Sequence, residues 1–93
     1  MPNMQSLSSL PPVWCDFNAC GWGDEDDDPC YYAFDWTTLS KLGVTDGLQI
    51  FAYMDDDVEG IEIVGCAATV ERWNDRWRVR PDPSTWYWGR RWW

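Results

Sequence analysis

The sequence contains no histidine and a single lysine, Lys41. Without histidine there is no imidazole to activate a serine or cysteine nucleophile, and the commonest general acid–base catalyst is missing. Lys41 follows no glycine-rich loop, which excludes a P-loop nucleotide site. Arginine could activate a cysteine thiolate, but no cysteine has a base next to it in the sequence. We therefore expect a protein without enzyme activity and without a cofactor.

Long apolar runs are also missing. No segment approaches the roughly 20 consecutive apolar residues that a membrane-spanning helix needs. The first twelve residues have neither the basic nor the apolar region of a secretory signal. The sequence thus predicts a cytoplasmic protein with no membrane partner. In the cytoplasm, cysteine thiols normally stay reduced.

Metal-binding patterns are incomplete. The four cysteines lack the C-x₂-C spacing typical of zinc sites, and the alternation around Cys15 and Cys30 favours small core residues. The acids at 24, 26 and 28 have the spacing of the first EF-hand ligands, but Pro29 stands where that loop requires glycine. We predict free thiols and no metal site.

Acidic residues are abundant and unevenly placed. The net charge is −9, with twelve acids against one base in residues 1–60 and four acids against six arginines in residues 61–93. This charge disfavours nucleic acid and anionic lipid as partners and favours a basic protein surface. Alternatively, the basic end of the chain folds back over its acidic part.

Period-2 alternation of apolar residues predicts most of the fold. It indicates strands near residues 13–19, 30–35, 48–54, 61–71 and 77–80, with a bulge at Gly65. Residues 35–43 form one or two helical turns, with Asp35 or Thr37 as N-cap and Gly43 at the end. The expected class is mostly β, that is, α+β with one short helix, as a small antiparallel sheet or a partly open five-stranded barrel.

The chain is expected to form one domain. Residues 1–12 are interpreted as a flexible lead-in, residues 13–80 as the β-rich domain, and residues 81–93 as a segment rich in tryptophan and arginine. Four of the nine tryptophans lie in the last eight residues, so this segment should pack on the domain or on a partner.

These features lead to a hypothesis of a small, non-enzymatic acidic protein that binds a basic partner surface, as an inhibitor, an immunity-type protein or a nucleic-acid mimic would. Two acidic loops would steer the partner and tryptophans would anchor it. The predicted partner-binding residues are Trp22, Asp24, Glu25, Asp26, Asp27, Asp28, Asp55, Asp56, Asp57, Glu59, Trp92 and Trp93.

Three alternatives remain open at the level of the sequence. The chain is also compatible with a structural subunit or homo-oligomer that docks through its tryptophan-rich C-terminal segment. A carbohydrate-binding or hydrolytic domain would use the tryptophans together with paired acids. Finally, the acidic loops could serve solubility alone.

Overall fold

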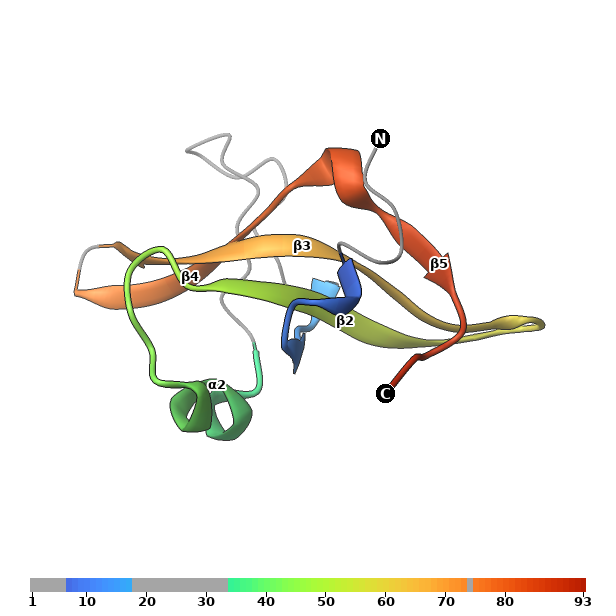
Figure 1. Ribbon diagram of the computed structural model, residues 1–93, viewed down its shortest axis with the longest axis horizontal. Helices are drawn as coiled ribbons and strands as arrows, with labels where there is room; N and C mark the ends of the chain where they lie inside the picture. Colours follow the sequence, from blue (N-terminus) through green and yellow to red (C-terminus); the bar gives the residue numbers. More distant parts are fainter. Residues whose placement is uncertain (1–6, 18–33, 74) are drawn as a thin grey trace.

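The computed structural model describes residues 7–17, 34–73 and 75–93. Its elements follow one another as β1 (Pro12–Trp14), α2 (Trp36–Leu42), β2 (Gln49–Val58), β3 (Ile61–Trp73), β4 (Arg76–Pro81), the 3₁₀ helix η2 (Pro83–Thr85) and β5 (Tyr87–Gly89) (Figure 1). The predicted class, mostly β with one short helix, is confirmed.

The strands form one mixed sheet that does not close into a barrel. The order is β1-β2-β3-β4, and β5 pairs with β3 as well. The pair β1–β2 is parallel and the other pairs are antiparallel, so the sheet is not wholly antiparallel. The reason is topological: the connection from β1 to β2 includes α2 and is long enough for the crossover that parallel strands require.

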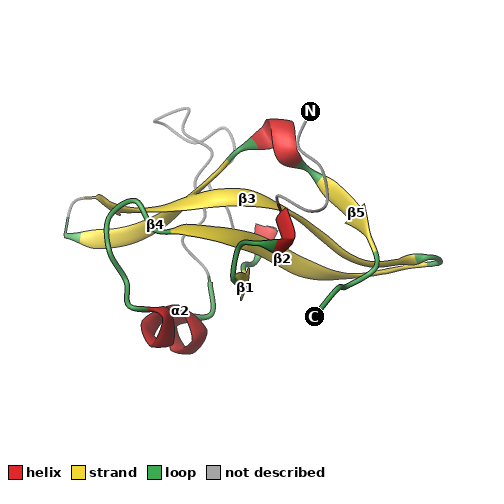
Figure 2. Ribbon diagram, viewed as in Figure 1, coloured by secondary structure: helices red, strands yellow, loops and turns green. Residues whose placement is uncertain are grey.

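Strand β3 is the central strand of the sheet, because it pairs with β2, β4 and β5. Along one edge it pairs with β2, and along the other it pairs first with β5, through residues 63–65, and then with β4, through residues 68–73. Figure 2 shows the consequence: the β2–β3 turn and the β3–β4 turn lie at opposite ends of the sheet. Gly60 closes the first turn with φ 80°, a backbone angle that glycine adopts without strain.

Helix α2 begins and ends where the sequence predicts. The Asp35 carboxylate accepts hydrogen bonds from the Thr38 backbone N–H at 3.2 Å and from the Thr38 hydroxyl at 2.7 Å. These bonds hold the pKa of Asp35 below its ordinary value. Gly43 ends the helix at φ 81° and donates to the carbonyl of Ser40. Leu39 is the fully buried residue that attaches the helix to the sheet.

Each face of the sheet carries a hydrophobic cluster. The larger one lies on the face covered by α2 and consists of Val13, Cys15, Leu39, Ile50, Ala52, Ala68, Val70 and Val79. The predicted alternation over residues 48–54 is confirmed for this face, since Ile50 and Ala52 belong to the cluster and Leu48 packs against it. The smaller cluster, on the other face, consists of Leu7, Phe51 and Ile63. Leu7 is 4% exposed, so part of the expected flexible lead-in packs against the domain.

Several expected elements differ in extent. The register between β2 and β3 runs without a break through Gly65, and the irregularity lies instead between Asp55 and Val58. The bulge prediction at Gly65 was therefore wrong. The first strand ends at Trp14, although an antiparallel bridge between Cys15 and Phe34 retains one pair of the expected hairpin. Most of its second strand, residues 30–33, lies outside the described residues. The fifth strand of the sheet is β5, within the segment expected to follow the domain.

Candidate functional site

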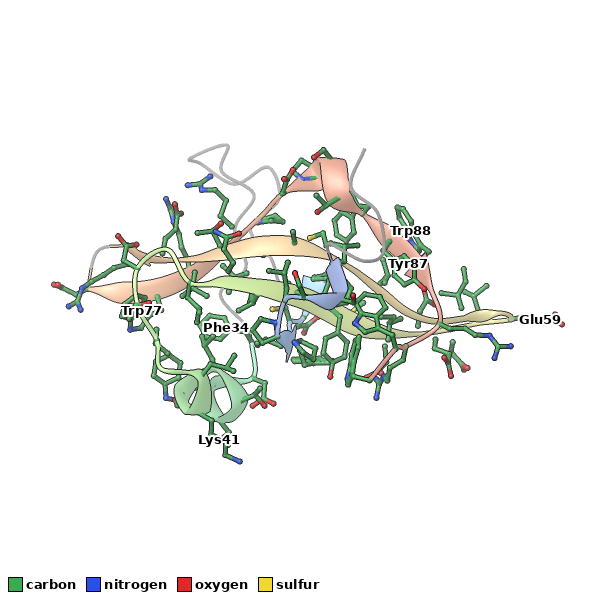
Figure 3. The ribbon with its side chains drawn as sticks, viewed as in Figure 1. Phe34, Lys41, Glu59, Trp77, Tyr87 and Trp88 are labelled. Atoms are coloured by element: carbon green, nitrogen blue, oxygen red, sulfur yellow. The ribbon has the colours of Figure 1, made fainter. Side chains whose placement is uncertain are left out.

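The end of the β2–β3 hairpin is strongly acidic. We call Asp55, Asp56, Asp57, Glu59 and Glu62 the acidic hairpin end. Residues 49–71 contain no lysine or arginine, and of these five side chains only Asp56 is half-buried. Figure 3 shows Glu59 at the tip of the hairpin, beyond the rest of the sheet.

The acids at 55, 56 and 57 lie on strand β2 and not in the acidic loop that the sequence predicts. The prediction of a loop at these three residues was therefore wrong. The turn is limited to Glu59 and Gly60, because Val58 and Ile61 already pair across it. Strand geometry accommodates the charges since this part of β2 is exposed to solvent. Charged side chains and a bulge are common on exposed strand edges, where they oppose unwanted pairing.

The last residues of the chain, 90–93, cross to the acidic hairpin end, and we call them the C-terminal strap. The Arg91 guanidinium donates to Asp55 Oδ1 at 2.6 Å, and the Arg91 backbone N–H donates to Glu62 Oε1 at 2.9 Å. The Tyr87 hydroxyl donates to the carbonyl oxygen of Arg90 at 2.9 Å. The basic end of the chain therefore does fold back over an acidic part, as one of the sequence interpretations holds.

Contacts between aromatic rings hold the C-terminal strap against the sheet. Trp92 lies 4.7 Å from Phe51 and 5.2 Å from Tyr87, measured between ring centroids. Trp93 lies 4.7 Å from Tyr53, and the Arg91 guanidinium stands 5.4 Å from the Tyr53 ring and 5.1 Å from the Trp93 ring. Trp92 is half-buried in these contacts, whereas Trp93 keeps 43% of its surface exposed. Of the two tryptophans predicted to bind a partner, Trp93 thus offers the larger free surface.

Further apolar surface adjoins this region. Val58 on the hairpin is 56% exposed, and Trp88 on β5 is 57% exposed. Figure 3 labels Trp88 on β5. Trp88 is paired with Val64, whereas its neighbour Tyr87 is paired with Gly65, so the two aromatic side chains point to opposite faces of the sheet. Trp88 contacts Trp86, which in turn meets Phe17 edge to face.

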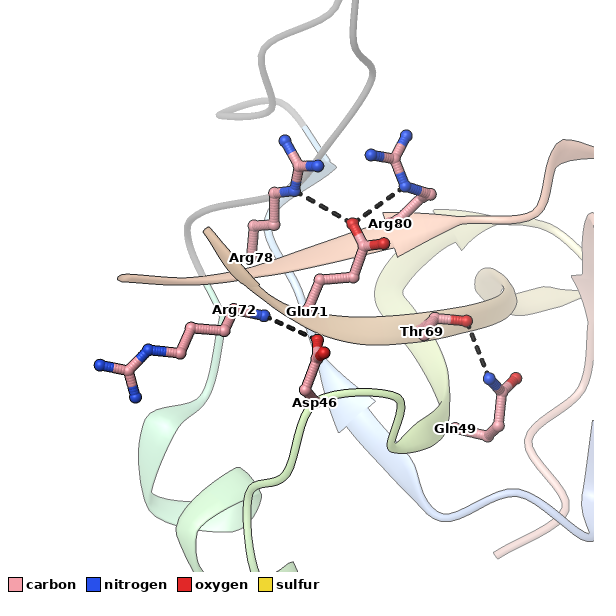
Figure 4. A network of polar contacts seen from close by, with 7 residues as sticks. All are labelled: Asp46, Gln49, Thr69, Glu71, Arg72, Arg78 and Arg80. Atoms are coloured by element: carbon pink, nitrogen blue, oxygen red, sulfur yellow. Dashed lines mark hydrogen bonds and ion pairs between the residues drawn. The ribbon is translucent and has the colours of Figure 1, made fainter. Parts of the chain in front are cut away.

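The opposite end of the sheet is basic and internally paired. Glu71 Oε1 accepts from Arg78 Nε at 3.0 Å and from Arg80 Nε at 2.9 Å (Figure 4). Alternation along β4 places these two arginines on one face of the strand, and Trp77 and Val79 on the face that meets the larger hydrophobic cluster. Asp46 also accepts from the Arg72 backbone N–H at 3.0 Å. At this end the carboxylates of Glu71 and Asp46 are thus engaged in contacts within the domain.

The described residues contain neither a pocket nor a group of three or more side chains suited to hold a metal ion. Cys15 and Cys66 are buried free thiols, and burial raises the pKa of Cys66 to about 12. The pKa of Cys15 is also raised, mainly by burial and further by the neighbouring Cys66. Both thiols are therefore neutral at ordinary pH and are poor nucleophiles.

Part of the predicted site lies outside the described residues, namely Trp22, Asp24, Glu25, Asp26, Asp27 and Asp28. The structure brings the other predicted residues into one region around Asp55 and the strap. Sequence reasoning omitted Glu62, Arg91 and Tyr53 from it. The one signal for Arg91 was its position directly before two tryptophans, and the pairing across 36 residues leaves no trace in the sequence.

Comparison with protein-family models, curated proteins and solved structures finds no match to this chain. Among the described helices, none is both long and apolar enough to cross a membrane.

Proposed function

We propose that this protein is a non-enzymatic binding domain whose acidic hairpin end engages a basic surface on another protein. One observation carries the proposal: Asp56, Asp57 and Glu59 have no hydrogen-bond or ion-pair partner among the residues that the structure describes. The acids of the other end are paired, as Glu71 is with two arginines. Acids with no such partner among the described residues are available to a cationic protein.

The arrangement has the physical properties of a steering surface. Several unscreened carboxylates at one projecting end create a negative potential that raises the association rate with a cationic protein. The ion pair between Arg91 and Asp55 neutralises only one of the five charges. Trp93 and Val58 supply exposed apolar area beside the charges, where an anchor would strengthen the complex. Inhibitors, immunity-type proteins and nucleic-acid mimics work through surfaces of this composition.

The alternative of self-association through the tryptophan-rich segment is less well supported. Trp92 packs on Phe51 and Tyr87 of its own domain, so it would have to leave these contacts before it could dock on a neighbour. Within residues 81–93 the exposed tryptophans are Trp88 and Trp93, and they make separate contacts on the sheet. We therefore give priority to the acidic surface.

The proposal can be tested by a matched pair of single-charge variants. Asp57→Asn removes an unpaired acid from the acidic hairpin end, and Asp75→Asn removes an acid with a 99% exposed side chain at the opposite end. Asparagine suits position 75 because that residue has φ 63°, which asparagine tolerates well. Partners are first captured from a lysate at low and high salt, identified by mass spectrometry and purified.

Binding of the purified partner is then measured for each variant as a function of salt. Asp57→Asn should slow association about threefold at low salt, and the triple variant Asp56→Asn/Asp57→Asn/Glu59→Gln should slow it at least about tenfold. Asp75→Asn should leave the rate unchanged. If the triple variant binds like the unaltered protein at every salt concentration, the acidic hairpin end is not the binding surface.

A further inference from the structure

We propose that the outer edge of β2, beyond Tyr53, receives an extended basic segment of the partner as an added strand. This inference rests on the proposed function, because it specifies what the acidic hairpin end recognises. Strand addition is a common way to bind a peptide: main-chain hydrogen bonds supply affinity, and alternate side chains supply specificity.

Among the described residues the outer edge of β2 is unpaired beyond Tyr53, because β1 is short. It pairs with β2 only from Phe51 to Tyr53, and the last bond runs from the Cys15 N–H to the Tyr53 carbonyl. The chain then leaves β2, since Cys15 bridges to Phe34 instead. Strand β2 itself continues to Val58. No described residue pairs with this continuation on the side that β1 vacates.

The backbone groups of Asp55 point to that open side. The Phe51 N–H donates to Pro11 and the Tyr53 carbonyl accepts from Cys15, so alternate residues of β2 present their polar groups to the outer edge. Asp55 is the next residue in this series, and the residues in between direct their backbone N–H and C=O groups to β3, as Leu48 does when its carbonyl accepts from Val70. Its N–H and C=O have no backbone partner among the described residues and are available to a new strand.

The negative charge of the β2 edge determines which kind of strand can pair with it. A second copy of this chain would bring its own carboxylates against Asp55, Asp56 and Asp57, and like charges directly opposite one another destabilise a strand pair. An extended segment rich in lysine or arginine meets opposite charges at the same positions. The edge therefore excludes copies of itself and admits a cationic strand.

The strap provides an apolar contact at the start of the open edge. Trp93 packs at 4.7 Å on Tyr53, the residue at which the pairing with β1 ends. Because 43% of Trp93 remains exposed, an apolar side chain of the added strand could cover it. The best ligand is thus an extended segment in which cationic and apolar residues alternate.

The test uses two capped peptides of alternating lysine and valine and the full-length protein. In one peptide every backbone nitrogen carries a methyl group, which keeps the charge and the side chains but removes the N–H donors along both edges of the extended chain. Affinity is measured by titration calorimetry, and amide hydrogen exchange is followed by NMR. The informative amides are those of Asp55, on the open edge, and Ala52, which faces β3.

Strand addition predicts that the unmethylated peptide binds about tenfold more tightly than the methylated one, since it makes the additional main-chain hydrogen bonds. It also predicts that exchange at Asp55 slows about tenfold or more in the complex, while exchange at Ala52 changes much less. The triple variant Asp56→Asn/Asp57→Asn/Glu59→Gln should weaken both peptides.

Equal affinity of the two peptides, with unchanged exchange at Asp55, would overturn strand addition. If both were still weakened by the triple variant, the acidic surface proposed above would stand. Failure of both peptides to bind at low salt would also overturn strand addition. The proposed function would then be judged separately, by the partner and the variants described for it.

Discussion

The ring of Phe51 occupies the space that a side chain at position 65 would need. A Cβ atom placed on Gly65 would stand 2.6 Å from Phe51 Cζ and 2.5 Å from the carbonyl oxygen of Ala52. The glycine therefore allows a large ring to lie flat on the sheet between β2 and β3. The C-terminal strap packs on this ring, because Trp92 and Trp93 both contact Phe51.

Gly65→Ala should destabilise the fold strongly. The Ala52 oxygen belongs to the backbone of the neighbouring strand and cannot move aside alone, so both β2 and Phe51 must shift. We expect a loss of about 2–3 kcal/mol in the free energy of unfolding, measured by urea titration with circular dichroism. Gly60→Asn is the control, because nothing lies within 4 Å of its Cβ position and asparagine tolerates the turn. A loss below about 0.5 kcal/mol for Gly65→Ala would contradict this packing.

Trp92→Ala should lower the free energy of unfolding more than Trp88→Ala, although both substitutions remove an indole side chain. Trp92 is half-buried against Phe51 and Tyr87, whereas 57% of Trp88 is exposed. We expect about 2 kcal/mol for Trp92 and less than about 1 kcal/mol for Trp88. Circular dichroism is again the suitable probe, since tryptophan fluorescence changes in the variants themselves. Equal losses would show that the strap does not pack on the sheet in solution.

Glu71→Ala should destabilise the basic end of the sheet. The side chain of Arg78 is only 11% exposed and the same Glu71 oxygen also accepts from Arg80, so removal of the carboxylate leaves two nearby positive charges without it. We expect a loss of about 2 kcal/mol in the free energy of unfolding. Asp75→Ala removes an acid whose side chain is 99% exposed and should have little effect. The interpretation fails if the two variants are equally stable.

Stability should fall at alkaline pH because of the buried thiols. The ordinary pKa of Cys66, near 9.0, applies to the unfolded chain, whereas in the folded protein it is about 12. Below pH 9 both states keep the proton, and the fold has its full stability. Between pH 9 and 12 the unfolded chain binds fewer protons, so the free energy of unfolding decreases as pH rises, by up to about 1.4 kcal/mol per pH unit.

Cys66→Ala should reduce that slope, which can be measured by urea titrations from pH 8 to 10.5. Burial also raises the pKa values of Cys15 and Tyr53, so part of the slope should persist in the variant. The informative quantity is the difference between the two slopes. Identical slopes would mean that the Cys66 thiol ionises as easily in the folded protein as in the unfolded chain.

Local patterns in the sequence predict the elements whose causes are local. Asp35 and Gly43 delimit α2 because capping depends on bonds within one helical turn. Alternation identifies β3 and the apolar face of β2, since side chains on a strand follow a period of two. The arginine face of β4 follows from the same rule.

Features that depend on distant partners are not readable in this way. The acids at 55–57 resemble a polar turn by composition, yet the ladder to β3 continues through Asp55 and keeps them on a strand. Strand β5 follows two prolines and is three residues long, too short for a pattern, and it exists because β3 extends beyond the end of β4. The contact between Arg91 and Asp55 depends on that placement of β5.

The turn at Glu59 and Gly60 divides the chain into two segments, and each segment supplies part of the sheet and part of both hydrophobic clusters. Residues before it supply β1, α2 and β2, residues after it supply β3, β4 and β5, and both hydrophobic clusters draw on the two segments. The covalent link there closes a two-residue turn that adds no side chain to either cluster. The domain is therefore suited to fragment complementation. Two separately produced chains, 1–59 and 60–93, should fold only when they are mixed. If each chain were fused to a different test protein, folding of the domain would report that the two test proteins bind each other.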